Sequence, residues 1–216
     1  MRVETKKIRD MFDYLSSDDS GLLLKANGAF VFCRDDPLVA RTVSDLMNKG
    51  LADYAMFTGG IGKDSGYLID LSLPEAKWQA GLLNMVHGIN KKNIYIEPTA
   101  SNGGECCRFG IDTIIKNELP HKNLIIVCHP TSLRRVKSVL TYIAREEKNF
   151  DSDYQKIGTP YAFNPENPND QKEAVAEMLR IADWPSRGWA DKQDDLPIDL
   201  VEYSRYINKC WNSNHE

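Results

Sequence analysis

Short runs of apolar, β-branched and aromatic residues alternate along this chain with longer segments in which apolar residues recur at helical spacing. The short runs lie at 29–33, 53–57, 93–96 and 123–128. They do not alternate strictly between apolar and polar residues, which favours strands that are buried on both faces, as in a parallel sheet.

The intervening segments carry apolar stripes at positions i, i+4, i+7 and i+8. Four stripes have this spacing, at 39–47, 78–86, 107–115 and 136–144. Strands that alternate with amphipathic helices are typical of βαβ units. The sequence therefore predicts an α/β fold, a three-layer Rossmann-like parallel sheet with helices on both faces and extra helices at both termini.

The two ends of the chain have a different pattern from its middle. A helix is expected over roughly 3–16, and helices around 174–182 and 197–211 follow a fifth strand at 155–162. Pro160 would place that fifth strand at a sheet edge, or would end it. We expect three parts in one compact domain. They are an N-terminal helical extension (1–27), an α/β core (28–165) and a C-terminal helical extension (166–216).

Composition limits the classes of function. Of the 216 residues, 42% are hydrophobic and 27% charged, which is typical of a globular protein. The net charge of −4 gives no general attraction to nucleic acid or to an anionic membrane. No apolar run approaches the ~20 residues that a membrane span requires. We therefore expect a small-molecule ligand rather than a nucleic-acid or membrane partner, and composition leaves the oligomeric state unknown.

The five cysteines are odd in number, and no secretion signal precedes them. Reduced thiols in a cytoplasmic protein are the expectation. No two cysteines have the spacing of metal ligands, and no His-x-x-x-His pattern occurs. No metal is therefore expected.

Polar residues and glycines follow each predicted strand of the core. The stretches are 34–36, 58–63, 97–105 and 129–135. Ligands of open parallel sheets bind outside the carboxyl ends of the strands. We therefore expect all four stretches to meet at one edge of the sheet and to form the functional site there.

Two of these stretches have alternative interpretations. The turn Thr58-Gly59-Gly60 either lets an anion approach backbone N–H groups or is a tight turn without a ligand. Glu97 and Glu105 flank a connection with free backbone donors at 102–104. The two carboxylates are candidates for acid–base chemistry, for holding ribose hydroxyls or for holding a cation. Alternatively, Glu105 only complements a helix dipole.

The fourth stretch combines a histidine with arginines. His129 directly follows a buried-type strand, and Arg134 and Arg135 come one helical turn later. Residues 120–148 contain six Lys/Arg and two Asp/Glu, a local charge of +4 that suits a phosphate or a carboxylate. The alternatives are a structural histidine and a solvated helix face.

The order of these motifs resembles that of the YdcF-like/SanA-like family, long labelled as a domain of unknown function. The resemblance spans roughly residues 28–145, and the matching positions are Arg41, Thr58-Gly59-Gly60, Glu75-Ala76, Glu97, Asn102, Glu105 and Arg134-Arg135. It implies a Rossmann-like fold with an active site built from charged residues. The soluble branch of the family fits better, because membrane-anchored members carry an N-terminal transmembrane helix. For that branch the resemblance suggests S-adenosylmethionine as a ligand; no cofactor is otherwise indicated.

Two functions stay open. The first is an enzyme, a hydrolase or group transferase, that acts on a small anionic or nucleotide-like molecule. The second is a non-catalytic binding module for a nucleotide or for S-adenosylmethionine. The expected catalytic residues are Glu75, Glu97, Glu105 and His129. The expected ligand-binding residues are Asp35, Arg41, Thr58, Gly59, Gly60, Asn102, Arg134 and Arg135.

Overall fold

The protein is built around one sheet of five parallel strands. The computed structural model describes residues 3–62 and 65–213, and within them the strand order is β3-β2-β1-β4-β5. The strands are β1 (Ala26–Phe32), β2 (Ala52–Thr58), β3 (Ile94–Glu97), β4 (Asn123–Cys128) and β5 (Asp153–Gly158). The predicted α/β class is confirmed, and the fifth strand lies at an edge, two residues before Pro160.

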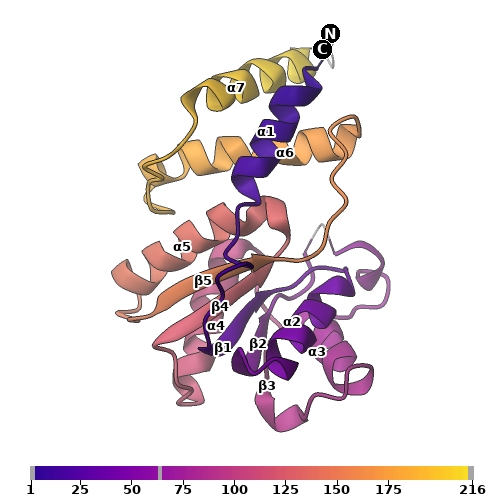
Figure 1. Ribbon diagram of the computed structural model, residues 1–216, viewed down its shortest axis with the longest axis vertical. Coiled ribbons are helices and arrows are strands. Elements are labelled where there is room, and N and C mark those ends of the chain that lie inside the picture. The colour runs from indigo at the N-terminus through magenta and orange to yellow at the C-terminus, as the bar shows by residue number, and fades with distance from the viewer. Residues whose placement is uncertain (1–2, 63–64, 214–216) are drawn as a thin grey trace.

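Helices cover both faces of the sheet, as Figure 1 shows. Helices α2 (Leu38–Asn48) and α3 (Glu75–Met85) pack on one face, and α4 (Gly103–Lys116) and α5 (Leu133–Glu146) pack on the other. Successive side chains of a strand point to opposite faces. The central strands β1 and β4 are accordingly apolar on both sides, which explains their continuous apolar runs.

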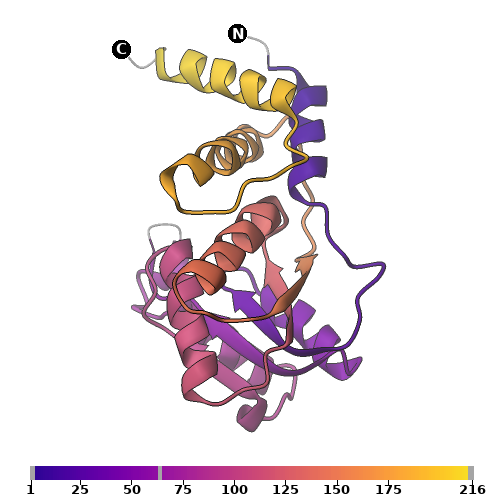
Figure 2. The same ribbon diagram turned by 90° about the vertical axis from the view of Figure 1, so that its left-hand side faces the viewer.

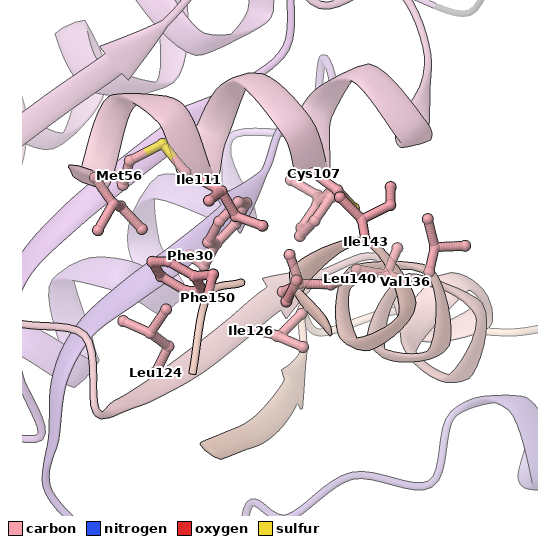
Figure 3. Close-up of a cluster of buried hydrophobic side chains, with 14 of the residues drawn as sticks. Phe30, Met56, Cys107, Ile111, Leu124, Ile126, Val136, Leu140, Ile143 and Phe150 are labelled. Atoms are coloured by element: carbon pink, nitrogen blue, oxygen red, sulfur yellow. The ribbon is translucent and has the colours of Figure 1, made fainter. Parts of the chain in front are cut away.

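The face under α4 and α5 holds the bulkier core. Phe30 of β1 and Met56 of β2 pack there against Ile111 of α4 and Leu140 of α5 (Figure 3). The opposite face is lined by smaller residues such as Ala29 and Ala55. The helical layers are therefore held by two separate apolar clusters, one on each side of the sheet.

A third apolar cluster joins the two ends of the chain. Helices α1 (Thr5–Leu15), α6 (Pro168–Asp183) and α7 (Ile198–Ser213) pack on one another through Ile8, Met178 and Ile207, all fully buried. Figures 1 and 2 show this helical layer beyond α5, at one end of the molecule. Short 3₁₀ turns complete the architecture, at η1 (Gly66–Leu68), η2 (Lys91–Asn93), η3 (Pro130–Ser132) and η4 (Pro185–Arg187).

Helix α3 buries a different stripe from the predicted one. The core side is formed by Ala76, Gln79, Ala80 and Leu83, whereas Met85 and Val86 of the predicted stripe are exposed. Trp78 makes an edge-to-face contact with Tyr67 of η1, at 5.7 Å between ring centroids. The largest side chain of the helix therefore packs on the connection between β2 and α3 rather than on the sheet.

No helix within the described ranges 3–62 and 65–213 has both the length and the apolar character of a membrane span.

Candidate functional site

The loops after the parallel strands meet at the carboxyl edge of the sheet, as the sequence predicts. The chain leaves β1 towards β2 on one side of the sheet, and it enters β4 on the other side of β1. The strand order thus reverses between β1 and β4, and the crevice at such a point is where open α/β sheets bind ligands. Arg34-Asp35-Asp36 and His129 lie at the carboxyl ends of these two strands.

Glu97 is buried at the end of β3, and both of its carboxylate oxygens are occupied. One oxygen accepts hydrogen bonds from the backbone N–H and the hydroxyl of Thr99, and the other accepts from Thr58 Oγ1 at 2.9 Å. The N–H of Ala100 donates to the same carboxylate. Glu97 therefore holds the turn that leads to α4 and ties it to the end of β2.

The glycine turn after β2 uses its N–H groups within the protein. Gly59 N donates to Glu97 O at 3.0 Å, and Gly60 N donates to Ala100 O at 2.7 Å. Gly59 has a φ of 141°, and a Cβ on Gly60 would lie 2.9 Å from Ala100 O. These glycines let two loops pack backbone against backbone. Their contacts match the alternative of a tight turn without a ligand.

The other two expected catalytic carboxylates lie at helix N-termini. Glu75 is the first residue of α3, and its Oε1 accepts a hydrogen bond from Ser65 Oγ at 2.7 Å. Glu105 accepts from both the N–H and the hydroxyl of Ser101, at 2.7 Å each, while Asn102 Oδ1 accepts from Glu105 N. The bonds from Ser101 lower the pKa of Glu105. The arrangement resembles a helix capping box, but the Glu105 carboxylate binds the N–H of Ser101, the residue before the N-cap Asn102, instead of the N–H of the N-cap itself.

Two guanidinium groups flank the glycine pair that begins α4. Arg135 Nη1 lies 3.1 Å from the position that a Cβ on Gly103 would occupy, and Arg108 Nη1 lies 3.1 Å from that position on Gly104. The first N–H groups of a helix have no partner within the helix. The absence of side chains at 103 and 104 thus lets two cationic groups approach the N-terminus of α4.

His129 forms the most closely connected cluster of titratable groups at this edge. Its ring is buried, and Nδ1 lies 2.7 Å from Thr131 Oγ1 and 3.3 Å from Glu173 Oε1. Thr131 Oγ1 donates to Glu173 Oε1 at 2.7 Å, and Arg34 Nη1 donates to the same oxygen at 3.2 Å. Tyr161 packs edge-on against the imidazole, with 4.4 Å between ring centroids.

The environment of His129 decides its charge. Burial lowers the pKa of His129 to about 4, and the positive charge of Arg34 adds to this effect, while Glu173 opposes it. Burial raises the pKa of Glu173, but the charges of His129 and Arg34 and a hydrogen bond from Thr131 outweigh it and lower that pKa. Near pH 7 the cluster thus contains a neutral imidazole and an ionised carboxylate.

The two expected arginines of α5 point to different places. Arg135 Nε donates to Glu177 Oε2 at 2.5 Å, and Glu177 is only 2% exposed. Arg134 Nε donates to Tyr14 O at 2.7 Å, and its Nη1 binds Asp195 Oδ1 at 2.8 Å. Arg135 therefore lies near the start of α4, whereas Arg134 joins α5 to the helical layer and is not part of the carboxyl-edge cluster.

The remaining expected ligand-binding residues also separate. Arg41 is exposed on α2, and its side chain forms no hydrogen bond or ion pair with any residue in 3–62 and 65–213. The Asp35 side chain lies against Gly66, whose φ is 52°. The expected site therefore does not form one cluster. Its carboxylates hold loops and helix starts, and His129 lies with groups from another helix.

Sequence reasoning missed the groups that surround His129. Glu173 and Glu177 lie one turn apart on α6, after Asp170, which accepts a hydrogen bond from Tyr161. The sequence does contain a signal for these residues: Asp170, Glu173 and Glu177 are spaced i, i+3 and i+7. All three carboxylates therefore lie on one face of α6, and this face points inward. Gln79 was missed as well. Its amide donates to Arg34 O and Asp36 O and so positions the loop after β1.

One further polar atom near this edge has no partner. Thr159 directly follows β5, and its N–H donates to Cys128 O. Its hydroxyl is buried and has no hydrogen-bond partner among the described residues. A buried hydroxyl without a partner costs free energy. The end of β5 therefore retains unused hydrogen-bonding capacity close to the end of β4.

No protein-family model matches the chain, and no curated protein matches it.

Proposed function

We propose that the protein is an enzyme that uses His129 as a general base on a small anionic or nucleotide-like molecule bound at the carboxyl edge, in hydrolysis or group transfer. The observation that supports it most is the linked set His129–Thr131–Glu173 at the point where the strand order reverses. The resemblance to YdcF-like proteins is consistent with this proposal and is itself a hypothesis.

The hydrogen bonds around His129 indicate which nitrogen of the neutral imidazole carries the proton. Thr131 Oγ1 donates its only proton to Glu173, so it accepts from His129 Nδ1. Nε2 is then the unprotonated nitrogen, and it makes no hydrogen bond to any described residue. A neutral imidazole with Nε2 free is ready to take a proton at pH 7. The nearby Glu173 carboxylate stabilises the imidazolium that forms.

Arg34 is the anion-binding group in this proposal. Only its Nη1 is engaged by Glu173, so Nε and Nη2 remain able to donate, and its side chain is 38% exposed. A guanidinium with free donors suits a carboxylate or a phosphate. Gln79 and Glu173 act as positioning residues, because they hold the loop of Arg34 and the imidazole respectively.

The carboxylates expected to be catalytic have another role in this proposal. Glu97 and Glu105 accept hydrogen bonds from the loop between β3 and α4, which they shape. The proposed reaction does not require S-adenosylmethionine. The turn after β1 contains no glycine, and β2 ends at Thr58 rather than at an acidic residue, so the glycine-rich dinucleotide fingerprint is absent.

The test begins with a thermal-shift screen of nucleotides, sugar phosphates and S-adenosylmethionine, followed by assays of hydrolysis and transfer with every stabilising compound. We expect His129→Gln to keep the stabilisation and to lose about 10²–10⁴-fold of kcat. Arg34→Ala is expected to lose the stabilisation. His87→Gln is the matched control, because His87 is a partly exposed histidine next to the end of α3 and outside the carboxyl edge.

Stabilisation that disappears in Arg34→Ala, without turnover in the unmodified protein, identifies the alternative function, a binding module. Turnover that is unchanged in His129→Gln contradicts the catalytic proposal. Glu173→Gln provides a second criterion. A positioning role predicts a lower kcat with little change in KM, and a shifted pH profile.

A further inference from the structure

A hollow of about 250 Å³ lies outside the carboxyl-edge site, between α5, β5 and the loop that joins α6 to α7. Figures 1 and 2 show these three segments next to the helical layer. The hollow is lined by Arg134, Lys137, Ser138, Thr141, Lys156, Asp191 and Gln193. Residues 134, 137, 138 and 141 form one face of α5, at i, i+3, i+4 and i+7.

Three cationic side chains and one carboxylate face this hollow. The carboxylate, Asp191, is bound by both Nη1 and Nη2 of Arg145, at 3.2 and 2.7 Å. Lys137 forms no ion pair with any residue in the described ranges. Arg134 is held by Asp195 and by Tyr14 O. The carboxylate that faces the hollow is thus already paired, and the hollow retains a positive charge.

Lys156 experiences the positive charge of the other cations that line this hollow. Its ammonium is half-buried at β5 and donates to Ser17 O. Burial lowers the pKa of Lys156, and the charges of Arg134 and Lys137 add to this, while Asp19 and Asp18 oppose it. Cations that repel one another around a concave surface are stabilised by an anion between them.

Neutral hydrogen-bonding groups line the same hollow. Thr141 and Gln193 contribute a hydroxyl and an amide. The Ser138 hydroxyl donates to Asp191 O, and Asp191 N donates to Ser138 O, so the loop is anchored to α5 at one point. Oxyanions with several charges are bound by this mixture of ammonium, guanidinium, hydroxyl and amide donors.

We propose that this hollow is a second binding site, for the phosphate group of a phosphorylated small molecule. The ligand would be held by Lys137 and Lys156 from opposite sides, with Arg134 at one end. Because Arg134 contacts Tyr14 and Lys156 contacts Ser17, the bound phosphate also links α5 and β5 to the last turn of α1 and to the segment that follows it. The proposal does not depend on the function proposed for His129.

The test is isothermal titration calorimetry of the whole protein with inorganic pyrophosphate, at a constant ionic strength of about 0.15 M, where long-range effects are screened. The titration is done in an Arg34→Ala background as well, so that binding at the carboxyl edge is removed. We expect saturable binding with one site per chain in that background. Lys137→Gln is expected to weaken it by about tenfold, and Lys137→Gln/Lys156→Gln to abolish it.

Lys116→Gln is the matched control, since Lys116 is an exposed lysine at the end of α4 and outside the hollow. Its affinity should equal that of the unmodified protein. Equal affinity in Lys137→Gln, or no saturable heat in the Arg34→Ala background, overturns the proposal. Lys137→Gln alone decides the question if substitution of the half-buried Lys156 prevents folding.

Discussion

Two carboxylates of α6 contact the arginines Arg34 and Arg135 and the neutral imidazole of His129. Glu173 holds Arg34 and His129, and Glu177 binds Arg135 and, at 2.5 Å, Arg180. Burying such charges costs free energy that only close, hydrogen-bonded pairing repays. The carboxylates therefore fix the position of the groups they contact. The imidazole of His129 stays neutral near pH 7 because burial and the charge of Arg34 outweigh the opposing effect of Glu173.

The low pKa of His129 predicts that the stability of the protein depends on pH. Its pKa is about 4 in the folded protein against 6.5 for an ordinary histidine, so between these values only the unfolded chain takes up the proton. The free energy of unfolding should fall as pH falls from about 6.5 to about 4. NMR titration should give an imidazole midpoint near pH 4, and lower in Glu173→Gln.

Urea unfolding at several pH values provides the control. His129→Gln should flatten the dependence in this window and leave it unchanged above pH 7. A midpoint near 6.5 in the folded protein would contradict the assignment.

Helices α4 and α3 differ in how closely they approach the sheet. A Cβ on Gly110 of α4 would overlap the Phe30 ring and lie 2.7 Å from Met56 Cε, so this glycine brings α4 onto the sheet. Gly81 of α3 has open space around the corresponding position. In α3, Ala76 and Ala80 lie on the core side together with Gln79 and Leu83, whereas Trp78 and Met85 lie on other faces.

Alanine at these two glycines should have opposite effects. Gly110→Ala is expected to destabilise by about 1–3 kcal/mol, because the added methyl group overfills a packed core. Gly81→Ala should stabilise by about 0.5–1 kcal/mol, since alanine loses less backbone entropy in a helix. Chemical unfolding of both variants measures this, and a stabilised Gly110→Ala would show that α4 does not approach the sheet as described.

At the scale of the whole molecule, residues from both ends of the chain meet on α5. Arg134 lies over the ring of Tyr14, with its guanidinium carbon 3.8 Å from the ring centroid, and binds Asp195. The same helical layer supplies Glu173 to the carboxyl edge. The extensions are therefore part of the arrangement that surrounds His129, rather than additions to a complete core.

Arg134→Ala should loosen this layer selectively. We expect a loss of about 1–3 kcal/mol, because hydrogen bonds made by a charged group are removed. Hydrogen exchange should become faster in α1 while the amides of β1 and β4 keep their protection. Arg205→Ala is the control, since its pair with Asp183 is exposed and should contribute less than about 1 kcal/mol. Equal effects of the two variants would argue against a special role of Arg134.

The sequence by itself determined the strands, the parallel sheet and the edge at which its loops gather. Local sequence patterns are sufficient to predict these features, because continuous apolar runs indicate strands that are buried on both faces, and apolar residues at helical spacing indicate helices. Tertiary structure alone decided that α3 buries Gln79 rather than Trp78, that Arg134 turns to Tyr14, and that Glu173 contacts His129. These partners are 44 to 120 positions apart or depend on the fit between helix and sheet. Such contacts follow from packing, which no local pattern specifies.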